Sequence, residues 1–268
     1  MKLFLKITIL LLAAYGFIAY FLVPTLWVHY EFHPALQSSP KTTQTKEGIP
    51  GDPLNVGLIG SQSEVIHALL KAGWHPADSI TLKTSLEIAE SILIGSSYPD
   101  APVSNLYLWG RHQDLAFEKL VGNNARQRHH VRLWRSDELG MGGRPFWIAA
   151  ATFDRSVGMS HRTGQVTHHI APDVDKERDN LVEDLKKAGQ LTILFQVTGV
   201  GVTLQGHNGG GDWYYTDGEI TIGMISTDNK VNTQISEIKL NPVPIQIKNN
   251  VFEIVKNIFE ITNKTSAS

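Results

Sequence analysis

The sequence predicts an α+β protein: a mixed, largely antiparallel sheet with a few packing helices, preceded by one N-terminal transmembrane helix. Three observations support this class. An uncharged apolar run lies near the N-terminus, the central hundred residues form successive strand-like segments, and few segments repeat apolar residues at helical spacing. The composition, with 42% hydrophobic and 19% charged residues, is typical of a globular chain with a sizeable core.

The N-terminal run extends from Ile7 to Val28, and its 22 residues carry no charge. A helix of this length measures roughly 33 Å, which is enough to cross the hydrocarbon core of a bilayer. Lys2 and Lys6 precede the run, and this favours a cytoplasmic N-terminus. We therefore expect a single-pass membrane protein that contacts the lipid bilayer through residues 7–28 and carries an extracytoplasmic C-terminal domain.

A cleaved signal peptide and a buried core helix are the alternatives for this run. A signal peptide needs a shorter apolar core followed at once by small residues, and the segment Phe21–Pro24 supplies no such site. A core helix of a soluble domain normally has a polar face, and none interrupts this run. The length and flanks of the run therefore favour a retained anchor.

The composition divides the chain into four parts. Residues 1–30 form the membrane anchor, and residues 31–50, rich in Pro, Ser, Thr, Gln and Lys, form a flexible tether. Residues 51–228 form the globular domain. Residues 229–268 are a C-terminal extension with a predicted amphipathic packing helix, whose apolar face carries Val251, Ile254, Val255, Ile258 and Phe259.

The globular domain contains segments with the apolar alternation of strands and segments with the apolar spacing of helices. The expected strands cover residues 54–60, 105–109, 113–119, 127–135, 145–154, 166–170, 191–198 and 220–225. The expected helices cover residues 61–70, 82–93 and 175–189, and Gly73 ends the first of them. Ser61 and Glu64 form a capping-box pattern at the start of the first helix, and Asp173 or Asp175 is suited to begin the last.

The composition also excludes several classes of function. The chain has no cysteine, which excludes disulfides, thiolate zinc sites and cysteine nucleophiles. Its net charge of -2 gives no support for a nucleic-acid partner. Neither a G-x-S-x-G motif nor the Gly-Lys-Ser/Thr end of a phosphate-binding loop occurs.

All nine arginines lie between Arg111 and Arg178, together with six of the eleven histidines but only two lysines. Arginine offers a planar, permanently charged group that binds carboxylate or phosphate through two hydrogen bonds. Buried ion pairs show the same preference for arginine, so a structural network with the protein's own carboxylates is the alternative to an anion site.

The expected strand over residues 127–135 has two faces of different character. Alternation places a cationic set with one aromatic ring on one face: Arg128, His130, Arg132 and Trp134. The other face carries Val131 and Leu133 and has the character of core. We expect the first face, with Arg111, to bind an anionic small molecule, a lipid headgroup or a phosphorylated glycan.

Histidines and carboxylates gather between residues 154 and 179, near a strand-to-helix junction. Open metal sites and acid/base pairs are often built at strand ends. The candidates for holding a divalent metal or transferring protons are Asp154, His168, His169 and Asp173, with His161 as a further ligand. Because neighbours on a strand point opposite ways, His168 and His169 should not bind one metal together. Helix capping by Asp173, with ion pairs to nearby arginines, is the structural alternative.

Residues 206–218, with the sequence GHNGGGDWYYTDG, contain five glycines. A hairpin loop that needs positive φ angles explains them. The functional interpretation is a flap whose bare backbone approaches a ligand, and it adds Asp212 to the ligand-binding candidates.

Several of these segments together resemble the LssY C-terminal domain family, over about residues 51–225. They are GDPLNVGLIG (51–60), YLWGRHQDLAFEK (107–119), RHHVRLW (128–134), AATFD (150–154), THHIAPDVDKERD (167–179) and NGGGDWYYTDG (208–218). The resemblance implies a membrane context and a link to type I secretion or envelope lipids, with envelope or secretion proteins as partners. Similar domains are fused to membrane phosphatase-like and DedA-like regions, but this chain has one N-terminal span and no phosphatase domain.

Three functions remain open at this point. The first is a membrane-anchored domain that binds an anionic ligand through its Arg/His-rich site. The second is a metal-assisted or acid/base hydrolase acting on a phosphoester. The third is a structural component of a secretion or envelope assembly, in which the arginines stabilise the fold.

Overall fold

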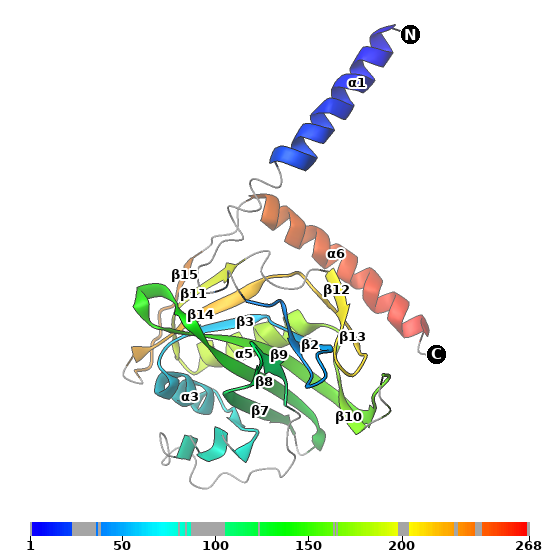
Figure 1. Ribbon diagram of the computed structural model, residues 1–268. Coiled ribbons are helices and arrows are strands. Elements are labelled where there is room, and N and C mark those ends of the chain that lie inside the picture. Colours follow the sequence, from blue (N-terminus) through cyan, green and yellow to red (C-terminus); the bar gives the residue numbers. More distant parts are fainter. Residues whose placement is uncertain are drawn as a thin grey trace.

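The α+β class is confirmed by the computed structural model (Figure 1). It describes residues 2–22, 36, 39–79, 81–83, 85–86, 105–122, 124–162, 164, 166–197, 204–227, 230–238 and 243–266. Most of the helix expected over residues 82–93 lies outside these ranges, as do residues 23–28 of the apolar run.

The N-terminal helix α1 (Lys2–Phe17) continues into a π-helical turn, η1 (Ile18–Leu22). The 20 residues Leu3–Leu22 have a mean hydropathy of 2.0 and are long and apolar enough to cross a membrane. None of this stretch is buried against the rest of the described chain, and Figure 1 shows α1 apart from the sheets. A helix in the core of a soluble domain would instead bury its apolar residues against the rest of the protein.

A mixed sheet of nine strands forms the centre of the domain, in the order β15-β11-β14-β3-β9-β8-β7-β4, with β10 paired to β9. Its strands are β3 (Val56–Ile59), β4 (His75–Pro76), β7 (Leu115–Val121), β8 (Asn124–Leu139), β9 (Pro145–Met159), β10 (Val166–Ile170), β11 (Leu191–Val197), β14 (Ile220–Ile225) and β15 (Ser236–Ile238). A short 3-10 turn, η3 (Met141–Gly143), joins β8 to β9. Among the described strands only the pairs β3–β14 and β11–β15 are parallel.

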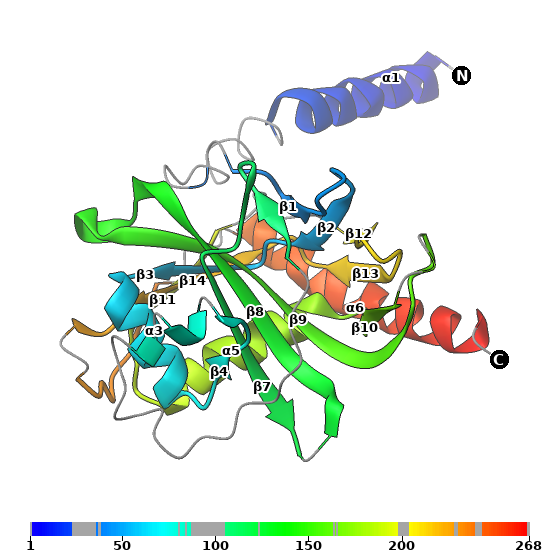
Figure 2. The ribbon, with the colours of Figure 1, turned by 60° about the horizontal axis from the view of Figure 1, so that its bottom comes forward.

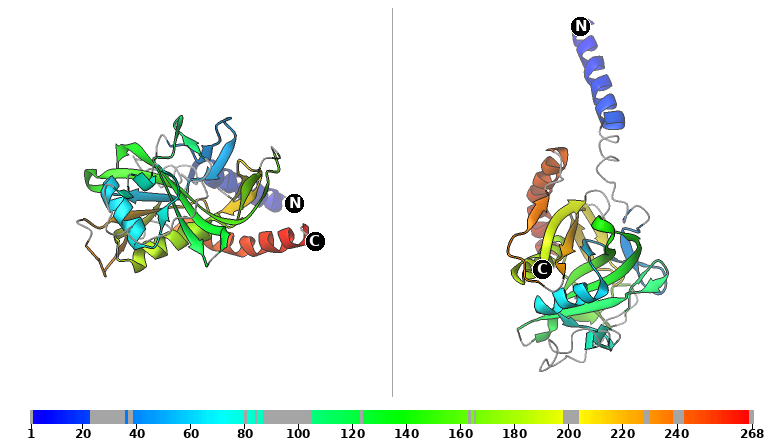
Figure 3. Two further views of the ribbon diagram at one scale, coloured as in Figure 1. Left: turned by 90° about the horizontal axis from the view of Figure 1, so that it is seen from below. Right: turned by 90° about the vertical axis from the view of Figure 1, so that its left-hand side faces the viewer.

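Helices α3 (Gln62–Lys71) and α5 (Val174–Lys187) cover one face of this sheet (Figure 3). The core beneath them contains Val131 and Leu133 of β8, Trp74, and residues of both helices. The capping box at the start of α3 is present, because Ser61 and Glu64 each accept a hydrogen bond from the other's backbone N–H. Burial of these apolar faces fixes both helices on the sheet.

The opposite face lies beneath two smaller sheets. One contains β1 (Thr42–Gln44), β2 (Pro50–Pro53), β5 (Tyr107–Leu108) and β6 (Arg111–His112), and the other is the hairpin of β12 (Leu204–His207) and β13 (Trp213–Thr216). Figure 2 shows both next to each other, beside β8 and β9. The structure differs here from the expected tether: Thr43 of β1 is buried, and its hydroxyl donates to the carbonyl oxygen of Asp52 at 3.0 Å.

The C-terminal residues pack onto the domain. β15 pairs with β11 and so adds a strand to the main sheet. Helix α6 (Val243–Ser266) buries Ile245 and Phe252, and the Phe252 ring lies 6.4 Å from that of Tyr215 in β13. Lys256 of α6 forms an ion pair of 2.8 Å with Asp173, at the start of α5.

Candidate functional site

The polar face of β8 lies between β7 and β9, and the register of these strands decides what it contacts. His130 is opposite Glu118 of β7 and Thr152 of β9, and Arg128 is opposite Asp154 of β9. Directly opposed residues in a sheet project from the same face. Two carboxylates therefore lie next to the cationic residues that the sequence places together.

Arg128 is fully buried among these groups. Its Nη1 donates to Glu118 Oε2 at 2.9 Å, and its Nε lies 3.6 Å from Asp154 Oδ2. Its Nη2 lies 3.1 Å from Nε2 of His168 in β10. Because a guanidinium group can only donate, this ring nitrogen accepts, and the proton of a neutral His168 is on Nδ1. The charge of Arg128 is thus neutralised inside the protein.

Asp154 joins two histidines. Its Oδ2 lies 3.1 Å from His130 Nδ1 and 3.0 Å from His168 Nδ1. Burial alone would raise the pKa of Asp154, but His130, His168 and Arg132 together lower it, so the carboxylate is held in its charged form. Burial lowers the pKa of His130, against the opposing charge of Asp154.

A cavity of about 250 Å³ opens beside this group. It lies between the main sheet, residues 45–49 of the β1–β2 connection and residues 208–210 of the β12–β13 turn. Its polar wall includes Asp52, His130, Arg132, Asp154, His168 and Asn208. Segments that are far apart in the sequence thus line one polar space.

Arg132 is the cation that the cavity wall takes from β8, and Asp52 is the carboxylate next to it. Its Nη1 lies 3.3 Å from Oδ2 of Asp52, and its buried Nε has no hydrogen-bond partner among the described residues. Burial raises the pKa of Asp52, and the charges of Asp154 and Asp212 add to this effect, while Arg132 opposes it. A buried polar atom without a partner is uncommon in proteins and calls for an explanation, such as a bound water or ion.

Among the expected ligand-binding residues, Arg111, Trp134 and Asp212 lie outside the cavity wall. Trp134 is fully buried in the core, so it has no exposed face on which a ligand could stack, and its Nε1 donates to the carbonyl oxygen of Arg111 at 3.4 Å. Arg111 binds the carboxylate of Asp114 and the carbonyl oxygen of Arg135, and these residues line a separate surface depression. Arg128, His130 and Arg132 remain together, but Arg128 is occupied.

Of the expected catalytic residues, Asp154 and His168 meet at the cavity and the other two do not. His169 points from β10 to Asp212, with 2.7 Å between Nδ1 and Oδ1. Asp173 is the N-cap of α5, where its Oδ1 accepts from the backbone N–H of Lys176 at 3.1 Å. Asp173 therefore caps a helix, which is the structural alternative to a catalytic role.

Other arginines also pair with the protein's own carboxylates. The buried Arg178 binds Asp217 through two nitrogens at 2.8 and 3.1 Å and also contacts Asp175 and Asp179. Burial opposes the charge of Arg178, but these carboxylates outweigh it and raise its pKa. Much of the arginine excess in the sequence thus stabilises the fold.

Three residues of the site have no signal in the sequence that would single them out. Asp52 follows a proline and glycine at a predicted domain boundary, Glu118 is one of several charges on its strand, and Asn208 belongs to the glycine-rich turn. Only the packing of the small sheets onto β8 and β9 brings Asp52 and Asn208 to the cavity.

Fold and site together define an α+β domain with a polar cavity, preceded by a helix able to cross a membrane. A family profile described as "LssY C-terminus" matches residues 36–220, well over half of the chain, and the chain belongs to this family. The matched range includes β1 and β2, which form one wall of the cavity. No curated protein and no solved structure matches the chain.

Proposed function

We propose that this protein is a membrane-anchored, extracytoplasmic domain that binds a small ligand carrying a phosphate or carboxylate group in the cavity. Arg132 would bind the anionic group, because its guanidinium group lies in the wall and one of its buried nitrogens has no partner among the described residues. An anion with two oxygens could accept from such a fork. This observation carries the proposal.

The rest of the wall suits the polar part of such a ligand. Asp52 and Asn208 offer acceptors and donors for hydroxyl groups, and the His130 ring, whose nitrogens lie 3.1 Å from Asp154 and 3.4 Å from Glu118, belongs to the same wall. The volume of about 250 Å³ is below the range of roughly 300–1,000 Å³ for drug-sized ligands. We therefore propose a headgroup-sized ligand, and the membrane context favours a lipid headgroup or envelope glycan, linked to an envelope or secretion process.

Thermal stabilisation of the full chain in detergent tests this proposal. Glycerol phosphate and inorganic phosphate should raise the melting temperature as their concentration passes the Kd, since a ligand that binds only the folded state stabilises it. Glycerol should have no effect. Arg132→Met should abolish the shift, and Arg144→Met is the matched control, because Arg144 pairs with Glu64 away from the cavity.

A further variant sharpens the same test. Asp52→Asn removes the carboxylate that competes for Arg132, so the affinity for phosphate ligands should increase. The proposal is wrong if no phosphate ligand stabilises the protein, or if Arg132→Met and Arg144→Met respond alike.

Hydrolysis of the bound phosphoester is a second candidate function, favoured by the 3.0 Å contact between Asp154 and His168 at the cavity. A carboxylate that orients a histidine is a common acid/base arrangement. However, Arg128 occupies the other nitrogen of His168, so proton transfer there would require this contact to open. Turnover of a generic phosphomonoester, lost in His168→Ala, would establish hydrolysis, and stabilisation without turnover would establish binding alone.

A further inference from the structure

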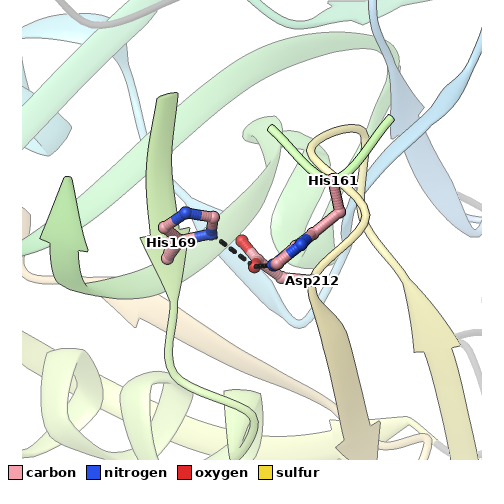
Figure 4. Close-up of side chains that lie close together, drawn as sticks. All are labelled: His161, His169 and Asp212. Atoms are coloured by element: carbon pink, nitrogen blue, oxygen red, sulfur yellow. Dashed lines mark hydrogen bonds and ion pairs between the residues drawn. The ribbon is translucent and has the colours of Figure 1, made fainter. Parts of the chain in front are cut away.

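Three side chains outside the cavity converge on one point (Figure 4). His169 comes from β10, His161 from the turn after β9, and Asp212 from the turn between β12 and β13. Asp212 Oδ1 lies 2.7 Å from His169 Nδ1 and 3.7 Å from His161 Nε2. The three candidate ligand atoms all lie within 4.8 Å of one another.

Hydrogen bonds hold Asp212 in place and leave its Oδ1 facing the two histidines. Its side chain is almost completely buried, its Oδ2 accepts from the backbone N–H of Ile170 at 3.1 Å, and its own backbone N–H donates to Asn208 Oδ1 at 2.9 Å. The carboxylate is therefore positioned before any ligand arrives.

Two glycines make room for the histidines. A Cβ atom at Gly158 of β9 would lie 2.7 Å from His169 Nε2, so the imidazole ring occupies the space of a missing side chain. A Cβ atom at Gly211 would lie 3.0 Å from His161 Cβ, and Gly211 has a φ of +89°, which disfavours other residues. The local sequence thus permits the close approach of the two rings.

We propose that His161, His169 and Asp212 form a binding site for a divalent transition metal, with Zn²⁺ as the best match. Two imidazole nitrogens and one carboxylate oxygen are typical Zn²⁺ ligands, and three protein ligands leave a fourth position open for water or a substrate. Ca²⁺ and Mg²⁺ prefer sites made only of oxygen atoms. The adjacent His168 points into the cavity on the other side of β10 and is not a ligand.

A metal bound at this site would link two turns, and one of them lines the cavity. The metal would connect the turn after β9 to the β12–β13 turn, whose residues Asn208, Gly209 and Gly210 line the cavity. The Ser160 hydroxyl already donates to the Gly210 carbonyl oxygen at 3.1 Å, so the two turns are in contact. This inference goes beyond anion binding and does not depend on it.

Zinc binding by the full chain tests the proposal. The protein is purified in detergent without a histidine tag, stripped with a chelator and titrated with Zn²⁺, and bound metal is measured by elemental analysis. We expect about one Zn²⁺ per chain. His161→Ala should lower the affinity by more than about 100-fold, since loss of a ligand exceeds the 10–100-fold effect of losing an outer partner.

Asp212→Asn and His207→Ala complete the test. Asp212→Asn keeps the shape of the side chain and should also lose the metal. His207→Ala removes an exposed histidine from β12 in the same hairpin and should bind Zn²⁺ as the unchanged protein does. His161 is 65% exposed, so its replacement leaves the fold intact even if the Asp212 variant unfolds. Failure of the unchanged protein to retain Zn²⁺, or equal affinity in His161→Ala, would overturn the assignment.

Discussion

At the scale of single residues, the partner decides what each arginine does. Arg128 and Arg132 lie four residues apart on the same face of β8, yet Arg128 is enclosed by Glu118, Asp154 and His168, while Arg132 is part of the cavity wall. A buried cation with two carboxylate neighbours stabilises the fold mainly because its removal leaves those charges uncompensated. Replacing Arg128 should therefore lower the stability of the fold, whereas replacing Arg132 should change the cavity.

Arg128→Met should destabilise the protein strongly. Loss of a buried ion-pair partner costs about 3–5 kcal/mol, which for a domain of this size lowers the melting temperature by about 6–20 °C. Thermal unfolding of the full chain in detergent measures this change. Arg162→Met, at an exposed position after β9, should change the melting temperature by less than about 2 °C. Equal effects of the two substitutions would contradict the structural role of Arg128.

Glu177 of α5 predicts a pH dependence of stability. Burial raises its pKa to about 7, although the hydrogen bond of 2.8 Å with His129 opposes this shift, and the charge of Asp184 adds to it. The folded state therefore holds this proton more tightly than the unfolded state, whose pKa is about 4.5. The resulting stabilisation is complete below about pH 4.5 and is lost as the pH rises through about 7.

Glu177→Gln should flatten this pH dependence, because the amide does not titrate. The difference in melting temperature between pH 5 and pH 7.5 should be smaller in the variant than in the unchanged protein, reflecting a contribution of at most about 3 kcal/mol. An unchanged difference would show that Glu177 is already ionised at pH 5 in the folded protein.

At the scale of elements, the alternation of β10 assigns adjacent histidines to different places. His168 contacts Arg128 and Asp154 at the cavity, and His169 contacts Asp212 near the turns. Strand geometry requires this separation, because successive side chains point to opposite faces. Pairing with β9 also brings Gly158 against the His169 ring.

Gly158→Ala should displace the His169 ring, because a methyl group would lie too close to its Nε2. We expect a loss of about 1–3 kcal/mol in stability from the forced shift, with weaker Zn²⁺ binding. Melting temperature and zinc titration measure the two effects. Ser156→Ala, at an exposed position on the same strand, is the control and should change neither. A neutral Gly158→Ala would contradict the tight approach of the ring.

At the scale of the whole molecule, an apolar helix precedes a domain that carries polar and ionic groups around a cavity. Lys2 and Lys6 at the start of the chain favour a cytoplasmic N-terminus, and in the orientation that we propose the cavity would lie on the other side of the membrane. The ligands available to the cavity would then be those of the cell envelope.

A reporter fused after Ser268 tests this orientation. Alkaline phosphatase, which is active only outside the cytoplasm, should be active in the fusion, and green fluorescent protein exported through the general secretory route should not fluoresce. Replacing Lys2 and Lys6 by Glu is expected to weaken this preference. A fluorescent fusion with inactive phosphatase would reverse the topology and place the cavity in the cytoplasm.

Features that depend on residues close together in the sequence can be predicted from it, and features that depend on residues far apart cannot. The residues expected in strands over 166–170 and 220–225 agree with β10 and β14, and the capping box at Ser61 is formed, because each depends on periodicity or on neighbours within one turn. β1 and β12 are not among the expected strands, because segments of three and four residues are too short to show an apolar alternation.

The candidate site shows the same division. Alternation along β8 correctly groups Arg128, His130 and Arg132 on one face, but it also groups Trp134 with them, although the β5–β6 sheet covers that residue. Nothing local distinguishes a covered position from an open one on the same face. The pairing of His169 with Asp212 joins residues 43 positions apart and depends on the β12–β13 hairpin folding onto β10.

The apolar N-terminal helix, the α+β class, the family and the concentration of arginine and histidine near the middle of the chain can all be read from the order of the amino acids. Three features depend on how the chain packs: which arginines are neutralised, the place of Asp52 and Asn208 in the cavity wall, and the convergence of His161, His169 and Asp212. The difference lies in the sequence separation of the residues that interact. Hydropathy and strand alternation are properties of consecutive residues, whereas the charge, burial and ligands of a site depend on segments that meet only when the sheets pack.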